Sequence, residues 1–299
     1  MICISPISIK DPRQSRGSLR ITVPCGKCGA CMHNRRTQWT FRLSQEAKHS
    51  YTTYFITLTY NEDNLHTQDI EFDFGNGTQI STINRLDKPD VQRFLKRIRY
   101  YQEQVTKRKI RFYCVGEYGR KSFRPHYHII IFNLDHNLVS IIARIWKLGM
   151  VKVDQLTPAR IHYITKYHVN PRKQEFKDMG IYPEFTLMSK GNRKEGKVGI
   201  GYQYISEAMI KHHREHGKPI VKHDGYDLPM PRYYKNRIWN EAELEAMTEE
   251  SRSRADDLYW KEIERLKKLG YNDADAELFN RYVWQAEKVQ QKAEDGGML

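Results

Sequence analysis

The sequence predicts an α+β fold, in which an antiparallel sheet carries helices packed on one face and is followed by a helical C-terminal extension. Three observations indicate it. Between residues 51 and 169 the strand and helix patterns follow the order β-α-β-β-α-β-α. Two apolar strand patterns, at 110–115 and 125–132, are separated by a short segment, which is typical of antiparallel neighbours. From residue 240 onward the pattern is that of amphipathic helices.

The first elements are predicted from local composition. Residues 1–24 are expected to be extended and irregular, and 32–49 helical. Residues 51–60 alternate and are rich in Thr, Tyr, Phe and Ile, so they predict a strand, and 61–84 predict a long loop that can hold a hairpin. A helix is predicted at 87–104, capped by Asp87 with Pro89 in its first turn. Its apolar positions recur at helical spacing: Val91, Phe94, Leu95, Ile98 and Tyr101.

The later elements follow the same reasoning. After the two apolar strands, a helix is predicted at 138–148 and ended by Gly149, and a short strand at 151–153. Thr157 and Pro158 begin another helix that runs to about residue 169, where Pro171 stops it. The remaining predictions are basic loops with short elements at 172–239, then acidic amphipathic helices that include Leu258, Ile263 and Leu266.

These elements predict three segments. Residues 1–50 form a cysteine-rich N-terminal segment and helix, 51–239 form the main domain with basic loops, and 240–299 form an acidic helical extension. The chain has 299 residues, enough for one large domain with an extension, and 39% hydrophobic residues, enough for a core.

Charge points to a polyanionic partner. The formal net charge is +14 and the sequence pI is about 9.4. Residues 240–299 carry 9 Lys and Arg against 15 Asp and Glu, a net charge of −6, so the rest of the chain carries +20. A surplus of this size favours nucleic acid as the partner of the first four-fifths of the chain. The alternative is a basic protein whose Lys and Arg side chains are merely solvated.

The five cysteines and the absence of targeting patterns indicate a reducing compartment. An odd number of cysteines with a tight triplet is unlike a disulfide framework. Residues 1–10 lack the pattern of a signal peptide, and no segment reaches 18 uncharged apolar residues. A cytoplasmic protein with no membrane contact is therefore expected.

Two histidines in the apolar strand at 125–132 suggest a divalent-metal site. His126 and His128 are two residues apart, so they lie on one face of the strand. A hard metal such as Mg²⁺ or Mn²⁺ also needs oxygen ligands. Glu117 ends the preceding strand, and a hairpin would return it to the same end of the sheet. The alternative is a pair of structural histidines.

A later helix carries two tyrosines on one face. Tyr163 and Tyr167 are four residues apart, and Lys166 lies beside them, while Ile161 and Ile164 face the core. Two hydroxyls one turn apart can reach one scissile phosphate. Because a phenol has a pKa near 10, it needs a metal that polarises the phosphate, or a base. Two amphipathic core tyrosines are the alternative.

The cysteine triplet indicates a zinc site. Cys25, Cys28 and Cys31 follow the pattern Cys-x-x-Cys-x-x-Cys, and three thiolates this close suit Zn²⁺. The pattern does not contain the fourth ligand, for which the candidates are His33, Cys114 and His49. Reduced cysteines without metal, or an iron–sulfur cluster, are the alternatives.

Basic side chains near these motifs are expected to contact phosphates, which positions DNA without reading its sequence. Tyr and Trp side chains can stack on unpaired bases. The candidate phosphate contacts are Arg35, Arg36, Arg120, Lys121, Arg124, Lys190, Arg193 and Lys194.

The combination of motifs resembles the HUH endonuclease superfamily. His126-Tyr-His128 on a central strand, with tyrosines on a later helix, matches that superfamily's signature, and the strand Phe55-Ile-Thr-Leu-Thr-Tyr60 resembles its first motif. The resemblance implies a ferredoxin-like or RRM-like antiparallel sheet. The two-tyrosine form, Tyr163-x-x-Lys166-Tyr167, resembles the rolling-circle replication initiators of the Microviridae.

Further motifs narrow the resemblance to the gokushovirus-type replication-associated proteins, over about residues 20–240. The chain departs from their pattern by an insert at 192–198, and the acidic C-terminus matches no motif. The motifs are Pro24-Cys25-Gly-Lys-Cys28-Gly-Ala-Cys31 with Arg35, Arg36 and Trp39, Gly116-Glu117-Tyr118-Gly119, Arg124-Pro-His126-Tyr-His128, Met188-Ser-Lys190, Gly199-Ile-Gly201 and Pro231-Arg-Tyr-Tyr-Lys235.

This resemblance implies an origin-nicking enzyme. Mg²⁺ or Mn²⁺ held by His126, His128 and Glu117 would polarise the scissile phosphate. One tyrosine would form a 5′-phosphotyrosine and free a 3′-OH primer, and the second would act after one circuit, when the displaced strand is rejoined into a circle. The implied partners are viral origin DNA, a host helicase and a host polymerase in the bacterial cytoplasm. No nucleotide cofactor is expected, because the chain has no Walker A motif.

Three other functions remain compatible with the sequence. The first is a non-replicative HUH nickase, such as a transposase or relaxase. The second is a non-catalytic single-stranded DNA-binding protein, which would form no covalent adduct. The third is a zinc-dependent regulatory protein, in which metal removal would abolish DNA binding rather than cleavage alone.

Overall fold

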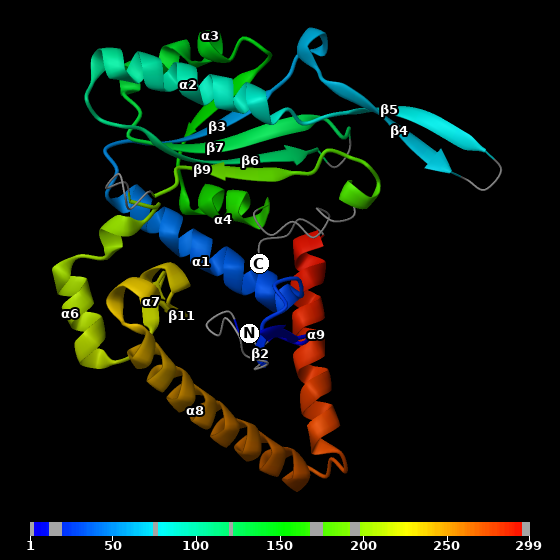
Figure 1. Ribbon diagram of the computed structural model, residues 1–299, viewed down its shortest axis with the longest axis vertical. Coiled ribbons are helices and arrows are strands. Elements are labelled where there is room, and N and C mark those ends of the chain that lie inside the picture. The colour runs from blue at the N-terminus through cyan, green and yellow to red at the C-terminus, as the bar shows by residue number, and fades with distance from the viewer. Residues whose placement is uncertain are drawn as a thin grey trace. The chain divides into compact units, whose positions relative to one another are not determined.

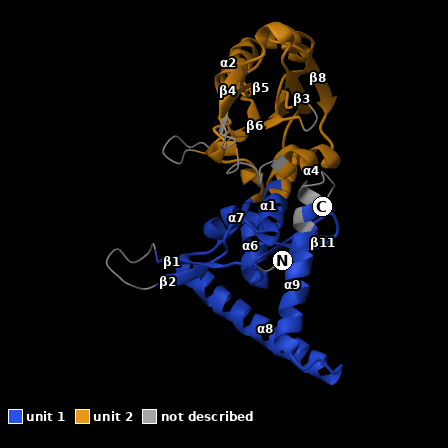
Figure 2. Cartoon of the chain, turned by 90° about the vertical axis from the view of Figure 1, so that its right-hand side faces the viewer, with its two compact units in different colours: residues 1–39, 205–299 blue, residues 40–204 orange. Residues whose placement is uncertain are grey.

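The structure, a computed structural model, divides into two compact units (Figure 2). Unit 1 contains residues 1–39 and 205–299, and unit 2 contains residues 40–204. None of the helices in the described part of the chain is long and apolar enough to span a bilayer. The described residues are 3–11, 20–73, 77–119, 122–167, 176–191 and 198–294.

Unit 2 is built on a five-stranded antiparallel sheet with the strand order β8-β3-β7-β6-β9 (Figure 1). The predicted α+β class and the predicted order of strands and helices are confirmed. The edge strand β9 lies in a segment where the sequence predicts loops with short elements. The strands are β3 (Thr53–Thr59), β6 (Arg111–Tyr118), β7 (Pro125–Phe132), β8 (Val151–Gln155) and β9 (Phe185–Met188).

Alternation along β7 separates the core from the candidate site. Tyr127, Ile129 and Ile131 belong to the core on one side of the sheet. His126 and His128 therefore lie on the opposite side, as the two-residue period requires. Helices α2 (Lys88–Val105) and α3 (Ile142–Trp146) cover the core side, as predicted, and α4 (Pro158–Tyr167) lies on the side of the histidines (Figure 1).

Helix α2 begins as predicted but differs from the prediction in its last turns. The Asp87 side chain accepts a hydrogen bond from the Asp90 backbone N–H at 2.8 Å, which caps the helix. Tyr101, predicted to face the core, is exposed, and Gln102 is buried in its place. The reason is local. The Gln102 amide donates to the carbonyls of Arg108 and Asn133 and accepts from the Asp135 N–H, which satisfies three backbone groups in a region away from water.

The helix predicted at 138–148 is shorter than expected. A 3-10 helix at His136–Ile141 leads into α3, and Lys147 then adopts a positive φ of 63°. Gly149 follows with a φ of 156°, and a Cβ at this position would lie 2.4 Å from the Thr59 carbonyl oxygen. Glycine is required here because the chain passes against the backbone of β3.

Two hairpins lie outside the central sheet. Strands β4 (Thr67–Asp73) and β5 (Thr78–Asn84) pair antiparallel within the segment predicted as a loop that can hold a hairpin. Strands β1 (Ile7–Lys10) and β2 (Arg20–Val23) also pair, with Ile7 opposite Val23. The prediction of an irregular N-terminus is therefore wrong for these strands, which are too short and too exposed to show a clear pattern.

The rest of unit 1 is mainly helical. The long helices α8 and α9 pack through Ile263, Leu266, Ala274 and Leu278, and Asn240 begins α8 with a capping box. Leu258, predicted to be on the apolar face of α8, is exposed. The elements of this unit after residue 205 are α6 (Glu207–His216), β10 (Ile220–His223), β11 (Tyr226–Pro229), α7 (Arg232–Ile238), α8 (Glu241–Lys268) and α9 (Ala274–Glu294).

Candidate active site

The candidate site lies on the sheet face opposite the α2 core, where three neighbouring strands present polar side chains. In the register of the ladder, Glu117 of β6 is directly opposite His126 of β7, and Thr57 of β3 is directly opposite His128. Cross-strand neighbours on one face of an antiparallel pair have Cβ atoms about 5 Å apart. The hairpin β6–β7 therefore returns Glu117 to the histidines, as the sequence predicts.

His128 is the best-ordered member of this group. Its Nε2 lies 2.8 Å from Glu117 Oε1, and its Nδ1 lies 3.1 Å from Thr57 Oγ1. The imidazole stacks on Phe55, with ring centroids 5.5 Å apart and an angle of 24° between the planes. The ring is buried and held at both nitrogens, so its orientation is fixed before any ligand binds.

Helix α4 brings Tyr163 to the same place. The Tyr163 hydroxyl donates to Glu117 Oε1 at 3.2 Å and lies 3.3 Å from His128 Nε2. The side chain is 40% exposed, so its hydroxyl contacts the buried carboxylate while the ring stays open to solvent. Ile161 and Ile164 are buried, as predicted, and Thr165 bonds Thr40 Oγ1 of helix α1 (Gly29–Lys48) at 3.1 Å. These contacts fix the rotation of α4.

His126 is less closely gathered with the others. It shares the sheet face, but its ring nitrogens do not form a cluster within 4.8 Å with His128 and Glu117. Its Nε2 lies instead against Gly119, where an added Cβ would approach to 3.1 Å. Burial, with the nearby His128, lowers the pKa of His126, and Glu117 only partly opposes this. The ring is therefore neutral at pH 7, which is the form that binds metal.

The donor set fits a hard divalent metal. Glu117 Oε2 is buried and has no hydrogen-bond partner among the described residues, although its Oε1 is fully engaged. A buried carboxylate oxygen without a partner is costly, and a cation would satisfy it. Two imidazoles and a carboxylate are a chemically reasonable set for Mg²⁺ or Mn²⁺ with water completing the shell.

Comparison with known proteins adds a family to this geometry. A family model of replication-associated proteins, described by the name ORF2, matches residues 53–172, which contain β3, Glu117, both histidines and α4. Curated relatives include the Replication-associated protein ORF2 of Spiroplasma virus 4, 27% identical over 243 residues, a match that covers 74% of this chain and 68% of the relative. The chain belongs to the replication-associated proteins of the Microviridae.

Two further members of this family match the chain over most of its length. The Replication-associated protein ORF4 of Chlamydia phage 1 is 25% identical over 235 residues, covering 72% of this chain and 53% of the relative, so the chain spans about half of that protein. The Replication-associated protein VP4 of Bdellovibrio phage phiMH2K is 23% identical over 267 residues, covering 79% of this chain and 76% of the relative. No solved structure matches the chain.

The other predicted site residues of this family member fall in different places. Lys166 is half-buried on α4, and Tyr167 ends that helix, although its side chain lies outside the described residues. Arg120, Lys121, Arg193 and Lys194 are also outside them. The placement of Tyr167 next to Tyr163 therefore rests on helical spacing.

Three predicted phosphate contacts differ in accessibility. Arg35 is exposed, whereas Arg36 is only 4% exposed, which leaves it little surface for a phosphate. Arg124 donates to Glu62 Oε1 at 2.7 Å and to the Tyr60 carbonyl at 2.8 Å, so it holds the segment after β3 in place. Its guanidinium is a structural clamp in this conformation.

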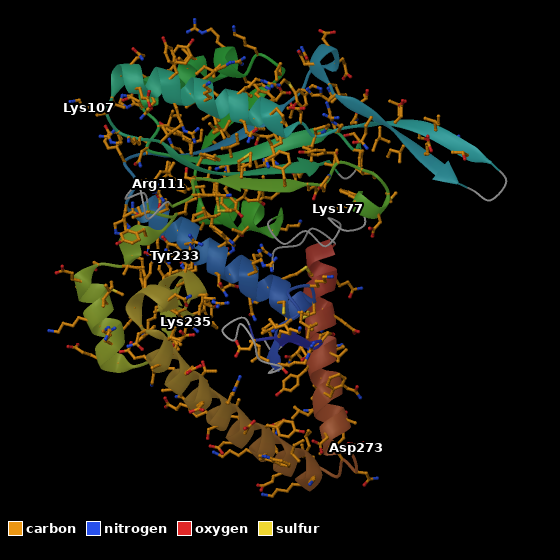
Figure 3. The ribbon with its side chains drawn as sticks, in the orientation of Figure 1. Lys107, Arg111, Lys177, Tyr233, Lys235 and Asp273 are labelled. Carbon is orange, nitrogen blue, oxygen red and sulfur yellow. The ribbon has the colours of Figure 1, made fainter. Side chains whose placement is uncertain are left out.

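Lys190 lines a basic cleft of about 720 Å³ at the far end of β6. Glu103 is the one acidic side chain among the described residues of the lining, and Lys107 and Arg111 lie beside the end of α2 (Figure 3). The sequence analysis did not identify this group of cations, because they come from separate elements. The basic lining residues are Arg99, Lys107, Arg108, Lys109, Arg111 and Lys190.

Among the described residues, two compact groups of side chains could hold a metal ion. One is Cys3, Cys25, Cys28 and Cys31, in which Cys3 is a member that the sequence analysis missed. The predicted fourth ligands are not part of it, and Cys114 is buried in the core of unit 2. The signal for Cys3 was only its place near the other end of a hairpin that the sequence does not show clearly.

The second group is His66, Asp87 and Asp90, on the core side of the sheet. Asp90 accepts hydrogen bonds from Tyr60 and Arg93, and bonds His66 at 2.8 Å. Burial alone would raise the pKa of Asp90, but these hydrogen bonds outweigh burial and lower it. Because protein cations already satisfy the carboxylate, this group is a helix-capping network.

Proposed function

We propose that this chain is a metal-dependent tyrosine endonuclease that nicks single-stranded DNA at a replication origin and remains attached to the new 5′ end. One observation carries the proposal. The Tyr163 hydroxyl lies within 3.3 Å of both Glu117 Oε1 and His128 Nε2, so a nucleophile, a carboxylate and an imidazole from three elements meet at one point. Such a cluster in contact with solvent is suited to phosphoryl transfer.

In the proposed reaction, the phenol oxygen of Tyr163 attacks the scissile phosphorus. The phenol proton moves to Glu117 Oε1, which already accepts its hydrogen bond. The bond from phosphorus to the 3′ oxygen breaks, and that oxygen takes a proton from water to become a 3′-OH. The products are a 5′-phosphotyrosine and a free primer end. Lys166 on the same helix offsets charge on the phosphate.

His126, His128 and Glu117 would hold Mg²⁺ or Mn²⁺, which when bound polarises the phosphate and stabilises charge on its oxygens. The buried, unpartnered Glu117 Oε2 supports this. The chain's own contribution is rigidity. Thr57 and Phe55 fix the His128 ring before the metal binds.

Tyr167 is the proposed second nucleophile. Helical spacing puts residues 163 and 167 on one face of α4, one turn apart. After one round of synthesis, attack by Tyr167 on the regenerated origin would let the released 3′-OH displace Tyr163 and close the displaced strand into a circle. The energy of the broken bond stays in the phosphotyrosine, so no nucleotide is consumed.

The names of the relatives support a role in phage DNA replication, in which the partners are origin DNA and the polymerase and helicase of the host, in the bacterial cytoplasm. The basic cleft at Lys190 supports DNA contact, because phosphate binding needs a concentration of cations. The cleft and the nucleophile both belong to unit 2. A non-replicative HUH nickase would share this chemistry and differ in its DNA.

A covalent-adduct assay tests the proposal. An end-labelled single-stranded oligonucleotide with the origin of the cognate genome is incubated with the protein and Mn²⁺ or Mg²⁺, then resolved on a denaturing gel. A labelled protein band is expected, and it should disappear in EDTA and in the Tyr163→Phe/Tyr167→Phe double variant. Tyr100→Phe, at an exposed tyrosine on α2, is the matched control and should keep the band. DNA binding without an adduct in any metal would favour the non-catalytic binding protein.

A further inference from the structure

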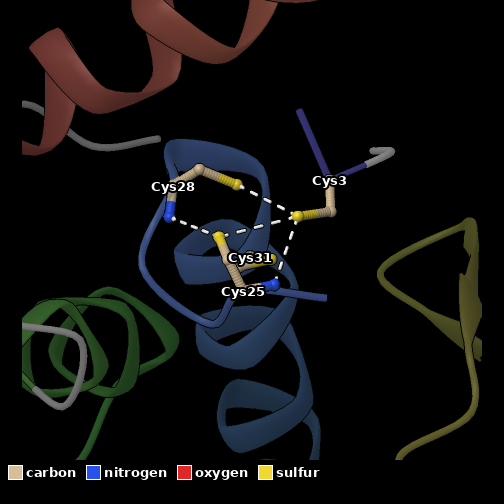
Figure 4. A group of neighbouring side chains, drawn as sticks. All are labelled: Cys3, Cys25, Cys28 and Cys31. Atoms are coloured by element: carbon tan, nitrogen blue, oxygen red, sulfur yellow. Dashed lines mark hydrogen bonds between the residues drawn. The ribbon is translucent and has the colours of Figure 1, made fainter. Parts of the chain in front are cut away.

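The four cysteines of unit 1 converge at the start of helix α1 (Figure 4). Cys3 Sγ lies 3.6 Å from Cys25 Sγ and 3.8 Å from Cys28 Sγ, and all four sulfur atoms lie within 4.8 Å of one another. Sulfurs of a disulfide would be about 2.0 Å apart, and all four cysteines are free thiols here. The group is thus too open for disulfides and tight enough for a shared ion.

The local fold delivers Cys3 to this place. In the β1–β2 hairpin Ile7 pairs with Val23, so the chain segments beyond the open end of the hairpin run side by side. Cys3 lies on one of these segments and Cys25 on the other, and the Cys25 N–H donates to Cys3 Sγ at 3.3 Å. A pairing over 22 positions is therefore set by the backbone and does not depend on the sulfur contact alone.

The turn at Cys25 is also shaped around sulfur. Gly26 adopts a φ of 74°, and the backbone N–H groups of Lys27 and Cys28 both point at Cys25 Sγ, at 3.4 and 3.3 Å. Helix α1 then begins and places Cys31 one turn after Cys28. Backbone N–H donors directed at a sulfur favour the thiolate, which is the form that binds metal.

We infer that Cys3, Cys25, Cys28 and Cys31 form a structural tetrathiolate zinc site. For a tetrahedral ion with Zn–S bonds of about 2.3 Å, the sulfur atoms stand about 3.8 Å apart. The separations of Cys3 Sγ from Cys25 Sγ and Cys28 Sγ match this value without any rearrangement. Four protein ligands leave no open position, so the site binds its metal for structure and not for catalysis.

Zinc binding balances as the exchange of one Zn²⁺ for the thiol protons that the four cysteines still carry, leaving a site with a net charge of −2. The ion joins the segment before β1 to the first turn of α1. Because no such constraint exists in the unfolded chain, binding free energy becomes folding free energy for the N-terminal part of unit 1. This role is independent of the nicking chemistry, whose residues all lie in unit 2.

Zinc-edge X-ray absorption of the full-length chain tests the inference. The protein is purified in reducing buffer with zinc and washed with EDTA to remove weakly held metal. The expected result is about one zinc per chain by elemental analysis, with four sulfur neighbours at about 2.3 Å. Zinc held by His126 and His128 would contribute light atoms only, so a failed nicking proposal and a failed zinc proposal are distinguished.

The matched variants are Cys3→Ala and Cys114→Ala, the second at a cysteine buried in unit 2. Loss of one outer-sphere partner typically weakens a metal site by 10–100-fold, so loss of the ligand Cys3 should speed zinc release to a chromogenic chelator by at least about tenfold. Cys114→Ala should release zinc like the wild type. Three sulfurs in the wild type, iron with labile sulfide, absence of zinc, or unchanged release from Cys3→Ala would each overturn the inference.

Discussion

The Tyr163 hydroxyl donates a hydrogen bond to Glu117 Oε1 at 3.2 Å, which joins helix α4 to strand β6. The same oxygen lies 2.8 Å from His128 Nε2, so the carboxylate is shared between the tyrosine and the histidine. A phenol that is already bonded to a carboxylate has its proton acceptor in place. The relationship also makes Tyr163 the better-positioned of the two tyrosines for the first attack among the described side chains.

The single tyrosine variants should separate the two nucleophiles. With Tyr163→Phe we expect a reduced but measurable initial nicking rate, because Tyr167 lies one helical turn away and can replace it. With Tyr167→Phe we expect initial nicking to be largely kept and strand joining to be lost. The measurement is adduct formation and circular product on an origin oligonucleotide. If one variant retains full nicking and joining, the two-nucleophile scheme is wrong.

Removing the charge of Glu117 should abolish chemistry while keeping DNA binding. Glu117→Gln keeps the size of the side chain, but the neutral amide is a poor ligand and a poor proton acceptor. Proton transfer to a positioned group typically contributes 10²–10⁴-fold, so we expect nicking to fall by at least about 100-fold. Binding to the same oligonucleotide, measured without metal by fluorescence anisotropy, should stay within about twofold of wild type. His126→Ala is expected to behave similarly.

Control spectra are needed for both of these variants, because Glu117 is buried and hydrogen bonded. Circular dichroism and urea unfolding should show a folded chain. An unfolded Glu117→Gln chain would assign the carboxylate to stability. A folded variant with normal nicking would remove Glu117 from the mechanism.

The sequence predicts the parts of the fold that depend on local periodicity. Strand β7 and helix α2 follow their apolar patterns, and alternation along β7 places both histidines on one face. What it could not predict depends on distant partners. Gln102 takes a buried position because it satisfies backbone groups of a later loop, which no helical pattern shows.

The site is divided in the same way. The spacing of His126, His128 and Glu117 suffices to predict their shared face, since strand geometry fixes it. The contact of Tyr163 with Glu117 depends on how α4 packs, and Cys3 joins the other cysteines only because β1 pairs with β2. Tertiary pairings of this kind leave little trace in one sequence.

DNA binding should weaken steeply with salt, and the basic cleft should contribute to the slope. Each phosphate contact releases counterions, so Lys190→Ala is expected to lower the slope of log affinity against log salt by about 1 and to weaken binding similarly for all sequences. Lys96→Ala, at an exposed position of α2 outside the cleft, is the matched control. A flat salt response of the wild type, or equal slopes for all three proteins, would exclude the cleft from DNA binding.

Acid should destabilise unit 1 through His213. This side chain of α6 is buried, and burial together with His212 and His216 lowers its pKa below the ordinary value of 6.5. Below pH 6.5 the unfolded chain therefore binds a proton that the folded chain does not, so stability is complete at neutral pH and falls as the pH drops. In His213→Gln this dependence should be weaker, and in His212→Gln it should be kept, as measured by urea unfolding between pH 7 and about pH 5. Identical pH profiles for wild type and His213→Gln would contradict the assignment.

Gly149→Ala should destabilise unit 2 strongly, because the new Cβ would lie 2.4 Å from the Thr59 carbonyl oxygen and 2.5 Å from the Asn61 nitrogen. These are backbone atoms next to β3, which cannot move aside as a flexible side chain would. Gly77→Ala is a close control, since Gly77 has a similar φ of 146° but an added Cβ would meet nothing within 4 Å. Strained φ alone costs about 1–3 kcal/mol, so we expect Gly77→Ala in that range and Gly149→Ala above about 3 kcal/mol in urea unfolding. Equal losses would show that backbone strain, and not the close approach to β3, explains the glycine at position 149.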